Sequence, residues 1–111
     1  MKKYLIIFLF LFLTLTLNRY GSAQEHEYKI MIKDHHFVPA ELRIPANLKV
    51  KVHIENLDSE AEEFESYDLD RERIIGANKT ITIFLGPLKP GTYKYFGEYN
   101  PDTAQGVIVV E

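Results

Sequence analysis

Apolar and polar residues alternate along most of the chain, which is the pattern of strands with one buried and one exposed face. The alternation is strict at 48–55 and recurs at 28–33. Short β-branched or aromatic runs follow at 80–85, 92–96 and 107–110. No window after the N-terminal segment has a sustained helical period. The pattern predicts an all-β Greek-key sandwich of about seven short strands.

Turn-forming residues separate these runs and support the division into short strands. Proline, glycine and asparagine gather at 45–47, 76–78, 86–87 and 90–91. Tyr93 comes two residues after a glycine, at the start of a late strand. This is the setting of a tyrosine corner, in which the hydroxyl bonds back to the connecting backbone. We therefore expect a structural role for Tyr93.

The N-terminal segment has the composition of a secretory signal peptide. Two lysines precede an apolar run at 4–17, and the small residues Gly-Ser-Ala end at Ala23. The run is shorter than the about 20 apolar residues of a membrane span, although an uncleaved anchor is the alternative. We expect residues 1–23 to be removed by cleavage near Ala23. A domain of residues 24–111 would then be periplasmic, without membrane attachment.

The expected mature domain is acidic and contains no cysteine. All 16 acidic residues but only 10 of the 13 basic ones follow residue 23, so residues 24–111 carry a formal net charge of −6. Such a surface argues against nucleic acid as a partner. Export permits disulfides, but a chain without cysteine forms neither disulfides nor thiolate–metal bonds. Stability must come from the core.

Carboxylates concentrate in the middle of the chain. Nine acidic residues lie at 55–72, where Arg71 is the one basic side chain. Apolar and aromatic residues interrupt the acidic ones, which is typical of a strand with its flanking loops and not of a disordered tail. On a strand, Glu63 and Glu65 would share one face and Phe64 would lie on the other.

The C-terminal part resembles the copper loop of the cupredoxin family without its ligands. In that family a Cys-x-x-His motif follows an aromatic strand, and a methionine precedes the closing strand. Here Gly97 stands at the cysteine position, Asn100 at the histidine position and Ala104 at the methionine position. Residues 37–46, with Phe, Pro and Pro-Ala, look like the entry motif of periplasmic cupredoxin-like domains.

A narrower resemblance is to the EfeO-type cupredoxin branch, which is associated with bacterial iron uptake. It is carried by the stretch Glu-Glu-Phe-Glu-Ser at 62–66, by Gly-Glu at 97–98 and by Thr-Ala-Gln-Gly at 103–106. Members commonly have a histidine after the Gly-Glu pair, where this chain has Asn100.

The resemblance implies where a metal would bind. Glu63 occupies the place of the family's first copper histidine, so Glu63 and Glu65 would point inward at the loop-bearing end. Glu98 lies beside the vacated thiolate position. Independently of the resemblance, His36 is a candidate ligand because it precedes Phe37 at a strand exit, which would place it near the acidic loop. A type 1 copper site needs a thiolate and is excluded. Carboxylates and imidazoles suit iron, manganese or Cu(II).

Three structural readings of the acidic segment stay open. Two inward carboxylates repel each other and would need a cation between them. Alternatively, Arg71 and Arg73 would pair with the glutamates. In the third reading Phe64 turns inward and the glutamates form a solvated surface.

Three functions follow from these readings. The first is a periplasmic metal-binding accessory of an iron-uptake system, holding iron or Cu(II) through Glu63, Glu65, Glu98 and His36. Its partner would be an iron permease or a periplasmic iron-transport protein. The second is a metal-free interaction module that docks a basic partner through its acidic face. The third is a small oxidase of ferrous iron, although the sequence contains no recognisable catalytic motif.

Overall fold

The computed structural model describes residues 26–111, in which every regular element is a β-strand. The expected signal peptide, residues 1–23, lies outside the described residues. Within the described part, no helix is long and apolar enough to cross a membrane. The strands are β1 (Glu27–Lys33), β2 (His36–Val38), β3 (Glu41–Ile44), β4 (Val50–Asn56), β5 (Glu62–Ser66), β6 (Arg71–Ile75), β7 (Thr80–Leu85), β8 (Gly91–Gly97) and β9 (Gln105–Val110).

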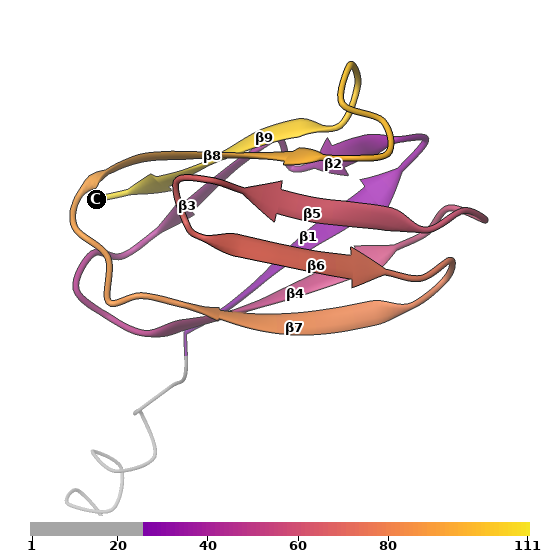
Figure 1. Ribbon diagram of the computed structural model, residues 1–111. Helices are drawn as coiled ribbons and strands as arrows, with labels where there is room; N and C mark the ends of the chain where they lie inside the picture. The colour runs from indigo at the N-terminus through magenta and orange to yellow at the C-terminus, as the bar shows by residue number, and fades with distance from the viewer. Residues whose placement is uncertain (1–25) are drawn as a thin grey trace, which may run out of the picture.

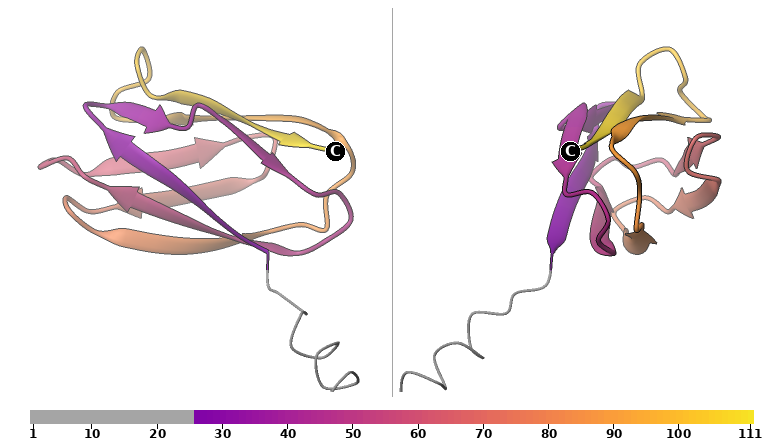
Figure 2. Two further views of the ribbon diagram at one scale, coloured as in Figure 1. Left: turned by 180° about the vertical axis from the view of Figure 1, so that it is seen from behind. Right: turned by 90° about the vertical axis from the view of Figure 1, so that its left-hand side faces the viewer.

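The strands form a sandwich of two sheets. One sheet has the order β2-β1-β4-β7 and the other β3-β9-β8-β5-β6. Figure 1 places β5 and β6 in front of β1 and β4, and Figure 2 gives two further views of the layers. The pairs β1–β4 and β3–β9 are parallel, and the remaining pairs are antiparallel. The predicted all-β sandwich is confirmed.

The strand count differs from the sequence-based expectation of about seven. Nine strands are present among residues 26–111. The difference arises mainly because β2 and β3 have only three and four residues, which is too short for an alternating pattern to stand out. β6 was also not expected, since its residues Arg71–Ile75 are mostly exposed.

Alternating side chains of the two sheets meet in one apolar core. On β4, Val50, Val52 and Ile54 are buried while the residues between them are half-buried. At the centre, the ring of Phe37 lies 6.2 Å from that of Phe64 and 4.9 Å from that of Tyr95, measured between centroids. The Phe64 and Tyr95 centroids are 4.8 Å apart. This aromatic cluster fixes which faces of β5 and β8 point inward.

Hydrogen bonds hold the connections around the core. The Tyr93 hydroxyl donates to the Lys89 carbonyl at 2.8 Å, which confirms the predicted tyrosine corner. Fully buried Asn56 donates from Nδ2 to the Glu60 carbonyl at 2.8 Å and accepts at Oδ1 from the Asp58 amide at 3.0 Å. Because these bonds fix the loop that leads into β5, they also set the position of the acidic residues that follow.

Candidate functional site

The orientation of β5 decides where its glutamates lie. Phe64 is 0% exposed and packs in the core, so Glu62 and Ser66 share its inward face. Glu63 and Glu65 therefore point away from the core, and the expectation that they point inward is wrong. The opposite orientation would bury two carboxylates and expose a phenyl ring, whose burial contributes roughly 1.5–3 kcal/mol. Phe64 turns inward, as one of the three alternatives expected, but the solvated surface of that alternative is not formed at Glu63, which is 8% exposed.

Glu62 is the glutamate that enters the interior. Its side chain is 1% exposed, and its carboxylate accepts three hydrogen bonds. The backbone amides of Glu63 and Tyr99 both donate to Oε1 at 2.9 Å. The side-chain amide of Asn100 donates to Oε2 at 2.8 Å. Burial of this charge is thus offset by N–H groups, as buried carboxylates require.

The Glu62 carboxylate fills the room that a side chain at position 97 would need. A Cβ on Gly97 would lie 2.6 Å from Glu62 Cδ and 2.6 Å from Ala104 Cβ. The loop is closed by a bond from the Gly97 amide to the Ala104 carbonyl at 2.8 Å. The three positions that carry copper ligands in the resemblance, namely Gly97, Asn100 and Ala104, therefore surround a protein carboxylate. Glu62 could not be singled out from the sequence, because the cupredoxin resemblance places Glu63 at the inward position.

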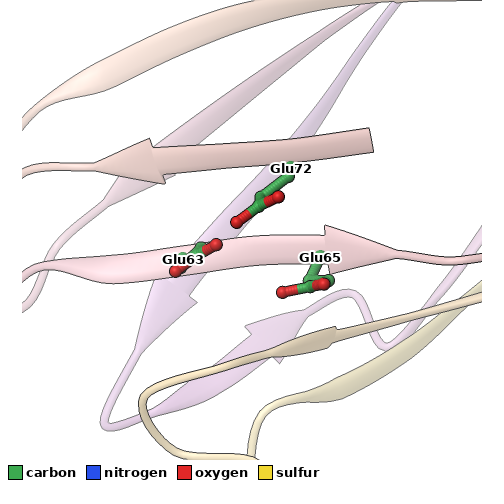
Figure 3. A group of neighbouring side chains, drawn as sticks. All are labelled: Glu63, Glu65 and Glu72. Atoms are coloured by element: carbon green, nitrogen blue, oxygen red, sulfur yellow. The ribbon is translucent and has the colours of Figure 1, made fainter. Parts of the chain in front are cut away.

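A second group of carboxylates lies on the outer face of the five-stranded sheet. Ligand oxygens of Glu63, Glu65 and Glu72 all lie within 4.8 Å of one another. We call these three residues the outer carboxylate cluster. Figure 3 shows it gathered over β5 and β6, where Glu65 and Glu72 are directly opposite in the strand register. Glu72 was not predicted as a site residue, because β6 was not expected and its pairing with β5 is what brings Glu72 to this face.

The pKa values of Glu63 and Glu65 are both raised. The pKa of Glu63 rises to about 7, first through a hydrogen bond with Glu72, then through burial, and then through the charges of Glu72, Glu65 and Glu98. Burial is the leading cause of the raised pKa of Glu65, followed by the charges of Glu72 and Glu98. Within residues 26–111, no lysine or arginine forms an ion pair with the cluster. The cluster therefore lacks a compensating cation from the described chain.

Of the other two predicted ligands, Glu98 lies beside the outer carboxylate cluster and His36 lies on the other sheet. The Glu98 amide donates to the Glu63 carbonyl at 2.9 Å, and the Glu98 charge contributes to the raised pKa of both Glu63 and Glu65. Glu98 is thus next to the cluster without belonging to the three closest carboxylates. His36 lies on β2 of the four-stranded sheet, where its Nδ1 is 2.8 Å from the Asp34 carbonyl oxygen. His36 is therefore not brought into the cluster.

The proposed pairing of glutamates with arginines is not observed in the described part of the chain. Arg71 donates to the backbone carbonyls of Leu69, Asp70 and Phe84. Neither Arg71 nor Arg73 forms an ion pair with a glutamate of β5. Arginine side chains of the described residues therefore do not neutralise the outer carboxylate cluster.

The raised pKa of Glu63 predicts a stability that depends on pH. Because the pKa of Glu63 in the folded protein is about 7 against its ordinary value of 4.5, the contribution of Glu63 to the free energy of unfolding is fully present below pH 4.5 and is lost as pH rises through 7. We expect the melting temperature of the metal-free protein to fall across this range, and to fall less in Glu63→Gln. Thermal unfolding in EDTA at several pH values measures both. Parallel pH profiles for the two proteins would contradict the raised pKa of Glu63.

The chain is similar in sequence to proteins of one family. The family model described as "Cupredoxin-like domain" matches residues 5–110. An uncharacterised protein of Rickettsia prowazekii (strain Madrid E) is 51% identical over 84 residues, which cover 76% of this chain and 67% of that protein. The name of that relative states no activity.

Solved structures of copper proteins share the fold. Auracyanin A, a "blue" copper protein of Chloroflexus aurantiacus, has a TM-score of 0.68 at 15% identity and covers 79% of this chain and 100% of its own. The metal-binding domain of the Streptococcus pneumoniae D39 Cu(I)-exporting P-type ATPase CopA has a TM-score of 0.69 at 13% identity, covering 81% and 91%. At such identities the likeness concerns the fold alone. The family match over residues 5–110 shows that the chain belongs to the cupredoxin-like domain family, and because it has no cysteine it lacks a type 1 copper site.

Proposed function

We propose that this protein is an exported cation-binding member of the cupredoxin-like family whose ligands are the outer carboxylate cluster. The observation that carries the proposal is the approach of three carboxylates to within 4.8 Å without a basic partner among the described residues. Like charges at this separation repel, and a bound cation would replace that repulsion with attraction. Glu98 would add a further oxygen donor beside Glu63.

The donor set favours hard or intermediate cations. Carboxylate oxygens suit iron and manganese, and they also accept Cu(II), whereas Cu(I) prefers sulfur ligands. We therefore propose iron or Cu(II) as the cargo. The net charge of −6 on residues 24–111 would attract cations to the protein.

The role in iron uptake rests on sequence resemblance. The acidic stretch 62–66, Gly-Glu at 97–98 and Thr-Ala-Gln-Gly at 103–106 resemble motifs of the EfeO-type branch. On this basis we propose that the protein acts in the periplasm, after cleavage near Ala23, as an accessory that passes its ion to an iron permease or a periplasmic iron-transport protein. A permease gene next to the gene of this protein would support the assignment.

Replacing Glu63 by glutamine is expected to weaken cation binding at least about tenfold. The amide keeps the size of the side chain but removes the charge of the most buried ligand in the cluster, which is 8% exposed. Calorimetric titration of the purified protein with anaerobic Fe(II), Mn(II) and Cu(II) gives the affinities. Glu41→Gln is the matched control, because exposed Glu41 pairs with Arg43 on β3. Equal affinities for wild type and Glu63→Gln would exclude Glu63 as a ligand.

A second candidate function is a metal-free interaction module that docks a basic partner. One specific observation favours it: large apolar side chains are exposed beside the carboxylates. Tyr67 is 78% exposed and Ile74 is 58% exposed, and Ile74 is directly opposite Glu63 in the register of β5 and β6. A metal ion would not cover these side chains, whereas a protein partner would.

A further inference from the structure

The outer carboxylate cluster belongs to a row of side chains that crosses the five-stranded sheet. Glu72 is opposite Glu65, Glu65 is opposite Phe96, and Phe96 is opposite Gln105. Phe96 points outward because its neighbour Tyr95 is 2% exposed and faces the core. Adjacent strands are about 4.8 Å apart. Two carboxylates, an aromatic ring and a polar amide thus lie side by side on one surface.

Two tyrosine side chains of this surface, Tyr67 and Tyr99, are exposed to solvent. Tyr67 packs against Phe96 with 5.6 Å between ring centroids, yet Tyr67 is 78% exposed. Tyr99, at 49% exposed, follows the end of β8 near Glu63. Aromatic side chains that stay exposed around a charged group are typical of protein interfaces and are over-represented among residues that dominate binding energy.

A groove continues the surface on the other side of Phe96. Its volume is about 540 Å³, within the range of sites that hold a side chain or a small ligand. Phe96, Val107 and Pro101 provide apolar walls. A hydrogen bond from Gln105 Nε2 to the Pro101 carbonyl, at 3.0 Å, holds the loop over the groove. The full lining comprises Ala40, Lys94, Tyr95, Phe96, Pro101, Gln105, Gly106 and Val107.

We propose that this face binds an extended segment of a partner protein that carries an arginine and, two residues away, an apolar side chain. The proposal rests on the second candidate function and names the chemistry of its partner. The guanidinium group would bind Glu65 and Glu72 and stack on Phe96, and the apolar side chain would enter the groove. Charge complementarity supplies the argument for the arginine, since the cluster contains the 8% exposed carboxylate of Glu63 without any basic partner in residues 26–111.

Arginine fits the geometry better than lysine. Its planar fork donates to two carboxylates at once and stacks on an aromatic ring, whereas the lysine ammonium is a strongly hydrated point charge. The distance across the sheet from the Glu65–Glu72 pair to the groove between β8 and β9 is roughly 10 Å, which is two strand spacings. Residues two apart on an extended segment are about 6.6 Å apart and direct their side chains to the same face. The side chains themselves cover the remaining distance.

A peptide titration followed by NMR tests the proposal. The probe is acetyl-Leu-Ser-Arg-amide, and the control peptide has citrulline, a neutral isostere, in place of arginine. We expect saturable shifts of the amides of Glu65, Glu72, Phe96 and Val107. We also expect the citrulline peptide to bind at least about tenfold more weakly. Glu72→Gln should weaken the arginine peptide similarly, while Glu41→Gln should not, because Glu41 lies on β3 and pairs with Arg43.

The outcomes separate this inference from the cation-binding proposal. Equal binding of the citrulline peptide, no saturable shift, or shifts centred on the β2-β1-β4-β7 sheet would overturn the arginine site. The same protein sample is then titrated with Mn(II). Metal binding without peptide binding would leave the cation site standing and overturn the docking site. Peptide binding without metal binding would leave the docking site standing and reject the cation site.

Discussion

Replacing Glu62 by alanine is expected to destabilise the protein by about 3–5 kcal/mol. The substitution removes the acceptor of three hydrogen bonds from Glu63, Tyr99 and Asn100. Each buried donor left without a partner costs about 1–3 kcal/mol, and the missing side chain adds a cavity. Since a domain of this size has a total stability of roughly 5–15 kcal/mol, the effect would be large. Urea unfolding of both proteins measures it.

Glu60→Ala provides the control for Glu62→Ala. Glu60 is exposed and precedes the same strand, and its backbone carbonyl, which accepts from Asn56, is kept in the variant. We expect its effect to stay within about 0.5 kcal/mol. If Glu62→Ala were as mild as Glu60→Ala, the carboxylate would not hold the loop that replaces the copper site.

The second large effect is expected for Gly106→Ala. A Cβ at this position would lie 2.3 Å from Cζ of Tyr95. The Tyr95 ring is 2% exposed and packs against Phe37 and Phe64, so it has no room to withdraw. Overpacking a core in this way typically costs about 1–3 kcal/mol and occasionally more, and we expect the upper end of this range because the contact involves a ring in the centre of the core.

Gly91→Ala is the matched control on the neighbouring strand. The nearest side-chain atom to a Cβ at Gly91 is 3.7 Å away, which is an ordinary contact. Both variants add one methyl group to the β8–β9 pair, and thermal unfolding compares them directly. Equal melting temperatures of the two variants would contradict the close packing of Tyr95 over Gly106.

Much of the fold follows from the sequence. The strict alternation at 48–55 corresponds to β4, and the runs at 80–85, 92–96 and 107–110 correspond to β7, β8 and β9. These strands bury one face, so hydrophobicity alone reveals them. The tyrosine corner at Tyr93 was also predictable, because it depends on a local sequence signal. Among the strands that were not expected, β6 exposes most of its side chains and pairs with β5, while β2 and β3 are too short for an alternating pattern to stand out.

The site was harder to predict because it depends on a choice between two faces. In the stretch Glu62–Ser66, glutamates occupy both faces of the strand, so the charge pattern does not say which carboxylate is buried. Phe64 decides the orientation, and a shift by one residue exchanges all inward and outward side chains. Glu63 and Glu65 were identified as a pair, but Glu72 joins them only through the β5–β6 register. The role of Glu62 could be recognised only once the tertiary structure placed its carboxylate beside Gly97.

A crystal structure of the protein with Mn(II), in which anomalous scattering locates the ion, shows whether a cation binds on the outer face or at the interior copper position that Glu62 fills. We predict one strong anomalous peak among the carboxylates of Glu63, Glu65 and Glu72, with no peak between Glu62 and Asn100. A peak beside Asn100 and Ala104, or an outer cluster without any ion at saturating Mn(II), would contradict this prediction.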